Sequence, residues 1–301
     1  MYLQHFGLRE FPFSLTPDIG FTYHATRFQE ALNTLLLALA GGDGFIKITG
    51  AVGTGKTLLC RSLLQRLADE RAGEPGSEPG TDYVTAYVPN PKLHPHEMLR
   101  CLALELGLRA RRLREEHELT TLIERKLLAL AAESKRVVLC IDEAQALPVE
   151  TLETLRLLSN LETGKHKLIQ IVLFGQEELN HMLARAPLRS LASRIGFSAS
   201  LSALSLSDFR AYLRHRLCVA GWSGPDLFTA SASHLLWRAS GGVPRKANTV
   251  AHKALLLSYG AGQHQVDVAT AWQAWRDDRT WFSALRALFS VFGTARLGAP
   301  G

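Results

Sequence analysis

The sequence has few cysteines and no long apolar run. Its four cysteines are widely separated, and no CxxC pair or CxxC…HxxxH spacing connects them. We therefore expect reduced, mostly buried thiols and neither a disulfide framework nor a zinc site. No apolar stretch reaches the roughly 18 residues that a membrane-spanning helix needs. The first residues also lack the basic start and apolar run of a signal peptide, so we expect a cytoplasmic chain.

The sequence also has only a small excess of positive charge. The formal net charge is +6 at pH 7, with 47% hydrophobic and 21% charged residues, a mixture typical of a folded globular protein rather than a disordered one. Nucleic acid, anionic lipid and nucleotide would all suit a basic chain. For 301 residues the excess is modest, so an ordinary solvated basic surface explains it equally well.

Apolar runs alternate with helical patterns over the first two thirds of the chain. Strands are expected at 45–49, 83–88, 137–141 and 168–174, with helices between them, a rhythm typical of a doubly wound parallel α/β sheet. From about 205 the pattern becomes all-helical. We therefore expect an N-terminal arm plus α/β domain at 1–204, a small helical domain at 205–278, and a C-terminal tail at 279–301. The tail is amphipathic, and we expect a docked terminal helix rather than a contact to a membrane surface or a partner.

A glycine-rich loop follows the first expected strand and precedes a helix. It satisfies the pattern G-x-x-x-x-G-K-[ST] in full. Its glycines let backbone N–H groups turn toward phosphate oxygens, and the helix start adds partial positive charge. The lysine is expected at the β- and γ-phosphates and the threonine at Mg²⁺. The loop thus predicts ATP binding by Gly50, Ala51, Val52, Gly53, Thr54, Gly55, Lys56 and Thr57.

Two adjacent carboxylates end the third expected strand. Asp142 and Glu143 follow the apolar run 137–141, which would deliver them to the sheet edge where open α/β sheets bind ligands. Asp142 is expected to hold Mg²⁺, and Glu143 to act as general base toward water. The alternative is that the pair simply caps the next helix. Beside a complete phosphate loop we favour the catalytic interpretation. A glutamate after the metal-binding aspartate indicates hydrolysis rather than phosphoryl transfer to a small acceptor.

Five segments, in order, resemble the AAA+ ATPases of the ExeA/GspA/MshM family, which serve bacterial secretion and pilus assembly. They are FGLREFPFSLTPD, FIKITGAVGTGKT, LCIDEAQAL, IVLFGQEEL and SGGVPRKAN, and they cover nearly all of 1–262. Within the family the sequence looks most similar to the MSHA-pilus ATPases. The resemblance implies a P-loop AAA+ α/β domain with a helical lid.

The resemblance also implies roles for single residues. Gln176 matches the sensor 1 position, which orients the water and the γ-phosphate. Arg194 matches the arginine finger that acts on a neighbouring subunit, with Arg189 as the competing candidate. Arg245 matches sensor 2. Because a finger supplied in trans completes the site only between subunits, the family implies a ring or another homo-oligomer.

The expected function is Mg²⁺-dependent ATP hydrolysis in type IV (MSHA-type) pilus or type II secretion assembly, with partners at the inner membrane. The chain itself would lie in the cytoplasm, held to that membrane only through a partner. A DNA-linked ATPase of the transposition-regulator type is the alternative, although neither a helix-turn-helix nor a long basic extension is evident. A small-molecule kinase is disfavoured by Glu143 and by the helical domain that carries Arg245.

Overall fold

The computed structural model describes residues 2–16, 19–23, 25–72, 82–89, 92–110, 115–162 and 167–277. The chain divides into two compact units, one formed by Thr26–Ser202 and the other by Met1–Ala25 together with Ala203–Gly301. Each is treated by itself below. The expected tail at 279–301 lies outside the described residues. No helix in the described part of the chain is both long and apolar enough to cross a bilayer.

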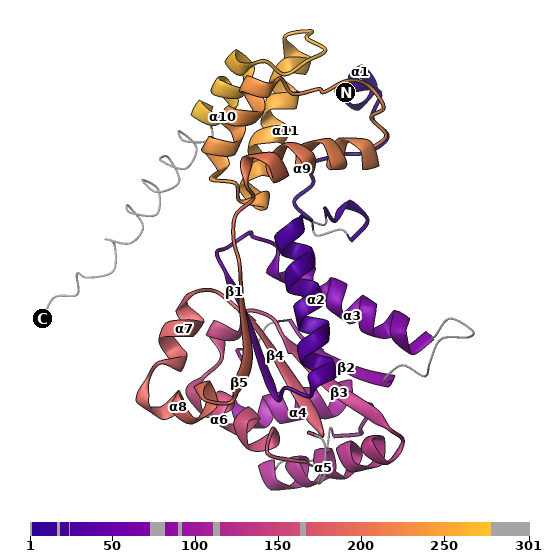
Figure 1. Ribbon diagram of the computed structural model, residues 1–301, viewed down its shortest axis with the longest axis vertical. Helices are drawn as coiled ribbons and strands as arrows, with labels where there is room; N and C mark the ends of the chain where they lie inside the picture. The colour runs from indigo at the N-terminus through magenta and orange to yellow at the C-terminus, as the bar shows by residue number, and fades with distance from the viewer. Residues whose placement is uncertain are drawn as a thin grey trace, which may run out of the picture. The chain divides into compact units, whose positions relative to one another are not determined.

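The α/β unit is built on a five-stranded sheet of order β2-β3-β4-β1-β5, in which every neighbouring pair is parallel (Figure 1). Parallel strands need crossover connections, and the helices between the strands supply them. The predicted doubly wound α/β fold is thereby confirmed. The strands are β1 (Phe45–Gly50), β2 (Asp82–Val88), β3 (Lys135–Ile141), β4 (Ile169–Gly175) and β5 (Ile195–Leu201).

Helices cover both faces of this sheet because its central strands are apolar on both sides. Alternate residues such as Leu139 and Ile171 share a core with α4, α5 and α6. The residues between them, such as Cys140 and Val172, are equally buried on the opposite face, where α2 and α3 contact each other (Figure 1). The helices of this unit are α2 (Thr26–Gly41), α3 (Lys56–Ala72), α4 (Pro95–Glu105), α5 (Glu116–Ala132), α6 (Val149–Leu158), α7 (Glu178–Leu183) and α8 (Arg189–Ala192), with short 3₁₀ turns η2 (Ala144–Ala146) and η3 (Ala186–Leu188).

Strand β5 was not expected from the sequence. It pairs with β1, with Gly50 opposite Leu201, and its side chains alternate between half-buried and exposed. Residues 195–201 contain one glycine, two serines and one alanine, and only Ile195 and Phe197 are of the β-branched or aromatic kind that typical strands are rich in. The strand therefore depends on its long-range pairing with β1. Arg194 directly precedes β5 in the sequence.

The second unit is helical, as expected for the C-terminal region. It contains α1 (Tyr2–Phe6), the 3₁₀ turn η1 (Ile19–Phe21), α9 (Leu206–Val219), α10 (Ala230–Ser240) and α11 (Pro244–Gly260), followed by helical residues 268–277. Its core joins the N-terminal segment to the later helices, because Tyr2, Phe6, Phe13 and Phe21 pack with residues of α9, α10 and α11. The expected division is therefore wrong in one respect: residues 1–25 belong to the helical unit and not to the α/β domain.

A buried arginine fixes this N-terminal segment to α9. The Arg216 guanidinium donates from Nε to the carbonyl of Pro12 and lies 4.8 Å from the centre of the Phe21 ring. Beside it the Phe13 ring meets Phe228 edge-on, with 5.9 Å between ring centres. Phe13 is only 2% exposed, so it acts as core packing of the helical unit.

Candidate nucleotide-binding site

Three neighbouring strands end at one edge of the sheet. Strand β4 lies between β3 and β1, and all three run in the same direction, with Thr49 opposite Gly175 and Ile141 opposite Leu173. The residues that follow these strands therefore meet at the carboxyl edge, where open α/β sheets bind their ligands. The glycine-rich loop follows β1, the acidic pair follows β3, and Gln176 follows β4.

The loop after β1 has the backbone that a phosphate cradle needs. Gly53 and Gly55 have φ values of 83° and 104°, a region that other residues rarely adopt. At Gly50 an added Cβ would lie 2.7 Å from the carbonyl oxygen of Leu201, so only glycine fits against β5. The loop then passes into α3, which begins at Lys56 and turns its N-terminus toward the same edge. Exposed N–H groups and a helix N-terminus together favour an anion.

Lys56 is folded over this loop. Its Nζ donates to the carbonyl oxygens of Gly50 at 2.8 Å and Ala51 at 3.0 Å, and the residue is only 5% exposed. Burial lowers the pKa of the Lys56 ammonium, while the nearby carboxylates of Glu143 and Asp142 act in the opposite direction. The ammonium is thus held by two neutral carbonyl groups, where an anionic phosphate would be a stronger partner.

Thr57 and Asp142 are in direct contact. The Thr57 hydroxyl donates to Asp142 Oδ2 at 2.6 Å, and the backbone N–H of Glu143 donates to Oδ1 at 3.0 Å. Asp142 is 3% exposed, and burial raises the pKa of its carboxyl group against the effect of these hydrogen bonds. A hydroxyl and a carboxylate at this spacing are hard oxygen ligands, which fit Mg²⁺. Among the described residues no three His, Cys, Asp or Glu side chains form a metal cluster. Mg²⁺ commonly binds through one or two protein oxygens with phosphate and water completing the shell.

Glu143 is the centre of a second group of contacts. Its backbone is left-handed, with φ 54° and ψ 38°, which turns the chain sharply after Asp142. Its Oε2 accepts a hydrogen bond from Gln176 Nε2 at 3.1 Å and a shorter one from Gln145 Nε2 at 2.6 Å. The structure therefore brings Gln176 to Glu143. The sequence analysis assigned no role to Gln145, because a single glutamine between two alanines has no spacing that indicates a function.

The hydrogen bonds described within this cluster do not involve the three arginines with predicted roles. Arg194 is exposed and donates to Asn160 Oδ1 within the α/β unit, and Arg189 is exposed on α8. Arg245 is exposed in the first turn of α11 in the helical unit, after a turn in which Gly241 and Gly242 have φ values of 61° and 70°. Their roles remain predictions.

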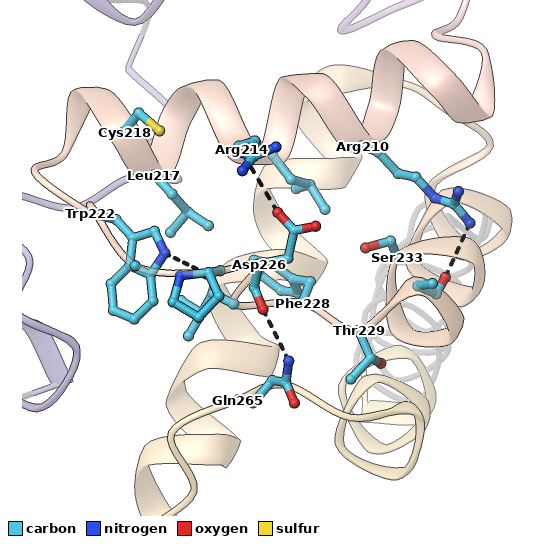
Figure 2. Close-up of a pocket in the computed structure, with 15 residues that line it drawn as sticks. Arg210, Arg214, Leu217, Cys218, Trp222, Asp226, Phe228, Thr229, Ser233 and Gln265 are labelled. Atoms are coloured by element: carbon cyan, nitrogen blue, oxygen red, sulfur yellow. Dashed lines mark hydrogen bonds and ion pairs between the residues drawn. The ribbon is translucent and has the colours of Figure 1, made fainter.

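The helical unit has a groove of about 380 Å³ beside α9 (Figure 2). Its lining residues all belong to the described part of the chain. Phe228 contributes to its apolar floor, and Arg210 donates to the carbonyl of Ala230. The carboxylate of Asp226 is paired with Arg214, with 3.6 Å between Oδ1 and Nε. Among the described residues that line the groove, Asp226 is the only one with a carboxylate.

Comparison with solved structures identifies the fold as that of the P-loop AAA+ ATPases. The Aeropyrum pernix ORC2 protein in its ADPNP–ADP complexes aligns with a TM-score of 0.61 at 19% identity, over 86% of this chain and 70% of that one. The Aeropyrum pernix ORC1 protein in complex with DNA aligns with a TM-score of 0.62 at 17% identity, over 96% and 78%. At these identities the likeness concerns the fold alone.

Sequence comparison agrees with this class. A family model described as an AAA domain matches residues 39–183, which include the loop, the acidic pair and Gln176. General secretion pathway protein A of Aeromonas hydrophila is 42% identical over 291 residues, which are 95% of this chain and 51% of the relative. The chain therefore spans about half the length of that relative. The AAA domain and the P-loop ATPase fold together support ATPase activity.

Proposed function

We propose that this chain is a Mg²⁺-dependent AAA+ ATPase that supports assembly of a type II secretion or type IV (MSHA-type) pilus apparatus. The observation that carries the enzymatic part is the continuous series of contacts from the phosphate loop to the acidic pair. Thr57 contacts Asp142, and Asp142 leads directly to Glu143, whose carboxylate is held by Gln176.

Each residue of the series has a role in hydrolysis. Residues 50–57 bind the β- and γ-phosphates through backbone N–H groups, and Lys56 exchanges its carbonyl partners for phosphate oxygens. Thr57 and Asp142 would hold Mg²⁺, and the bound ion would neutralise part of the phosphate charge. A water attacks the γ-phosphorus while Glu143 accepts its proton, and the bond to the ADP oxygen breaks. Gln176 orients the same water.

The site is completed by a second copy of the chain. Arg194 is the candidate finger because it is exposed at the start of β5, and its partner Asn160 is a neutral amide that a phosphate would displace. Arg189 is the alternative on α8. Arg245 would contact the γ-phosphate from the helical unit. A ring or another homo-oligomer follows from this proposal.

The cellular role rests on the relative from Aeromonas hydrophila, whose name places it in general secretion. Its 42% identity over 95% of this chain supports a related task here. The MSHA-pilus assignment rests on the five resembling segments. We propose a cytoplasmic location, peripheral to the inner membrane through assembly partners.

Hydrolysis measured with and without metal tests the enzymatic proposal. We expect ATPase activity that EDTA removes and that excess Mg²⁺ restores. Full activity in EDTA would contradict the roles of Thr57 and Asp142. Adding double-stranded DNA separates the assembly role from a DNA-linked ATPase, the alternative suggested by the net charge of +6 and by the DNA complex of the ORC1 neighbour. Unchanged activity is expected; strong, salt-sensitive stimulation would overturn the assembly proposal.

A further inference from the structure

Gln145 connects two of the strand ends that form the site. From η2, after β3, its Nε2 donates to Glu143 Oε2 at 2.6 Å. Its Oε1 accepts from the backbone N–H of Gln176, after β4, at 3.0 Å. The amide of Gln145 therefore bridges the carboxylate of the proposed base and the backbone of the sensor residue.

The chemistry of the partners fixes the orientation of this amide. An ionised carboxylate only accepts hydrogen bonds, and a backbone N–H only donates them. Rotating the Gln145 amide by 180° would place oxygen against oxygen at Glu143 and N–H against N–H at Gln176. Both polar atoms of the side chain are thus committed, and each to a different element of the site.

The backbone around Gln145 is shaped for this bridge. Glu143 has the left-handed conformation that begins the turn Ala144–Ala146. On the other side, Gly175 ends β4 directly under the amide. A Cβ at Gly175 would lie 3.2 Å from Gln145 Oε1 and 2.7 Å from Leu179 Cδ2. Glycine at this position therefore leaves the space in which the bridging amide lies.

Both of these amide donors bind the same oxygen of Glu143. Gln145 and Gln176 donate to Oε2, and none of the hydrogen bonds found among the described residues involves Oε1, so this second oxygen can accept from another partner. A carboxylate held by one oxygen has a fixed direction, and a general base must lie within hydrogen-bond reach of the proton that it accepts. The bridge thus restricts which oxygen meets the water.

We propose that Gln145 is a positioning residue for ATP hydrolysis: it holds Oε2 of Glu143 and ties it to the backbone of Gln176, so that Oε1 accepts the proton of the attacking water. This proposal rests on the role of Glu143 as general base. Gln145 does not itself touch the nucleotide in this scheme, and its effect is exerted through Glu143.

Two substitutions of Gln145 separate its two hydrogen bonds. Gln145→Met removes both with little change in volume, while Gln145→Glu keeps an acceptor for the Gln176 N–H but places a carboxylate against Glu143. We expect kcat to fall about 10- to 100-fold in both variants, because a misplacement of about 1 Å can cost that much. The dissociation constant of a non-hydrolysable ATP analogue should change by less than about twofold, as expected for a group acting in the hydrolysis step.

Gln170→Met is the matched control. Gln170 is a buried glutamine of the same unit, and its Nε2 donates to the carbonyl oxygens of Leu39 and Asp43. Its loss should lower stability without lowering kcat. Equal losses of kcat in Gln170→Met and Gln145→Met would reduce Gln145 to a structural role, and a rise in kcat for either Gln145 variant would mean that the bridge restrains Glu143 instead.

A double-mutant cycle with Glu143→Gln distinguishes this proposal from the one on which it rests. If Gln145 acts through Glu143, adding Gln145→Met to Glu143→Gln should cause no further loss of kcat, whereas independent effects would multiply. Near wild-type turnover in Glu143→Gln alone would remove Glu143 as the base. If Glu143→Gln is slow while the single Gln145 variants keep full activity, only the positioning role of Gln145 is overturned.

Discussion

The two units of the molecule are built in different ways. In the α/β unit the candidate site is assembled by hydrogen bonds among residues of the segments that follow β1, β3 and β4. In the helical unit the core depends on joining the N-terminal segment to distant helices, since Tyr2 and Phe13 pack with α9 to α11 more than 190 residues away. The first unit holds the residues of the candidate site, and the second unit is held together by long-range packing.

This difference shows where the protein is sensitive to change. Substitutions at the sheet edge should alter binding or turnover while leaving the fold intact, because they affect charged and polar groups beside a rigid sheet. Substitutions in the N-terminal segment should alter stability while leaving the chemistry of the site unchanged. The predictions below test that separation.

The largest effect is expected at Lys56. Lys56→Ala should abolish nucleotide binding at micromolar concentrations, because the ammonium is the one side-chain cation held inside the loop by Gly50 and Ala51 among the contacts described. Fluorescent-nucleotide titration measures the effect. The control is Lys47→Ala, which removes a lysine of β1 whose Nζ donates to Asn180 at 2.6 Å. If Lys56→Ala still binds nucleotide with micromolar affinity, the assignment of residues 50–57 to phosphate binding would be contradicted.

The next largest effect tests whether the candidate site of one copy is complete without a neighbouring copy. Arg194→Ala should lower ATPase activity about 10³-fold if the guanidinium acts on the γ-phosphate of a neighbouring copy. Mixed with Lys56→Ala protein, part of the activity should return, because a copy with intact Arg194 then faces a copy with an intact loop. Arg189→Ala tests the alternative finger on α8 and should keep most of the activity if Arg194 is the finger. No recovery at any ratio, in variants shown to co-assemble, would contradict a finger supplied in trans.

A smaller effect is expected in the helical unit. Phe13→Ala should destabilise the protein by about 3–5 kcal/mol, because it leaves a cavity beside Phe228. Phe11 lies two residues earlier and is 47% exposed, so Phe11→Ala should cost much less. Thermal unfolding of the two variants makes the comparison. Equal losses would mean that the N-terminal segment does not belong to the core.

The smallest effect concerns pH. The Tyr2 hydroxyl and His252 Nδ1 are 3.0 Å apart, and burial lowers the pKa of His252 below its ordinary value of 6.5. Between the lowered value and 6.5 the unfolded chain binds more protons than the folded one, so stability rises with pH across that window. His252→Asn should reduce this dependence in unfolding curves collected across the window. An unchanged pH dependence would show that His252 does not contribute to it.

The sequence predicted the parts of the molecule that local patterns determine. The loop at Gly50 to Thr57 and the strand ending at Asp142 are recognisable because spacing and apolar runs are properties of neighbouring residues. The all-helical pattern expected from about residue 205 agrees with α9, α10 and α11, since an apolar period and the proline at the start of α11 are equally local signals. The fold class followed from the alternation of these elements.

The parts that were missed depend on long-range contacts. Strand β5 exists because it pairs with β1, and residues 1–25 join the helical unit because Arg216 and its neighbours bind them. Gln145 acquires a role only when β4 places Gln176 beside it. None of these contacts leaves a spacing that a single sequence displays.

The central claim is that the cluster at the sheet edge hydrolyses ATP with Glu143 as base, and Glu143→Gln tests it most directly. Glutamine keeps the shape of the side chain and removes its ability to accept a proton from water. Binding of ATP should persist, while single-turnover hydrolysis should slow by about 10²- to 10⁴-fold. Glu177→Gln, at an exposed position just after Gln176, is the matched control and should hydrolyse ATP normally. Hydrolysis by Glu143→Gln at the wild-type rate would contradict the account.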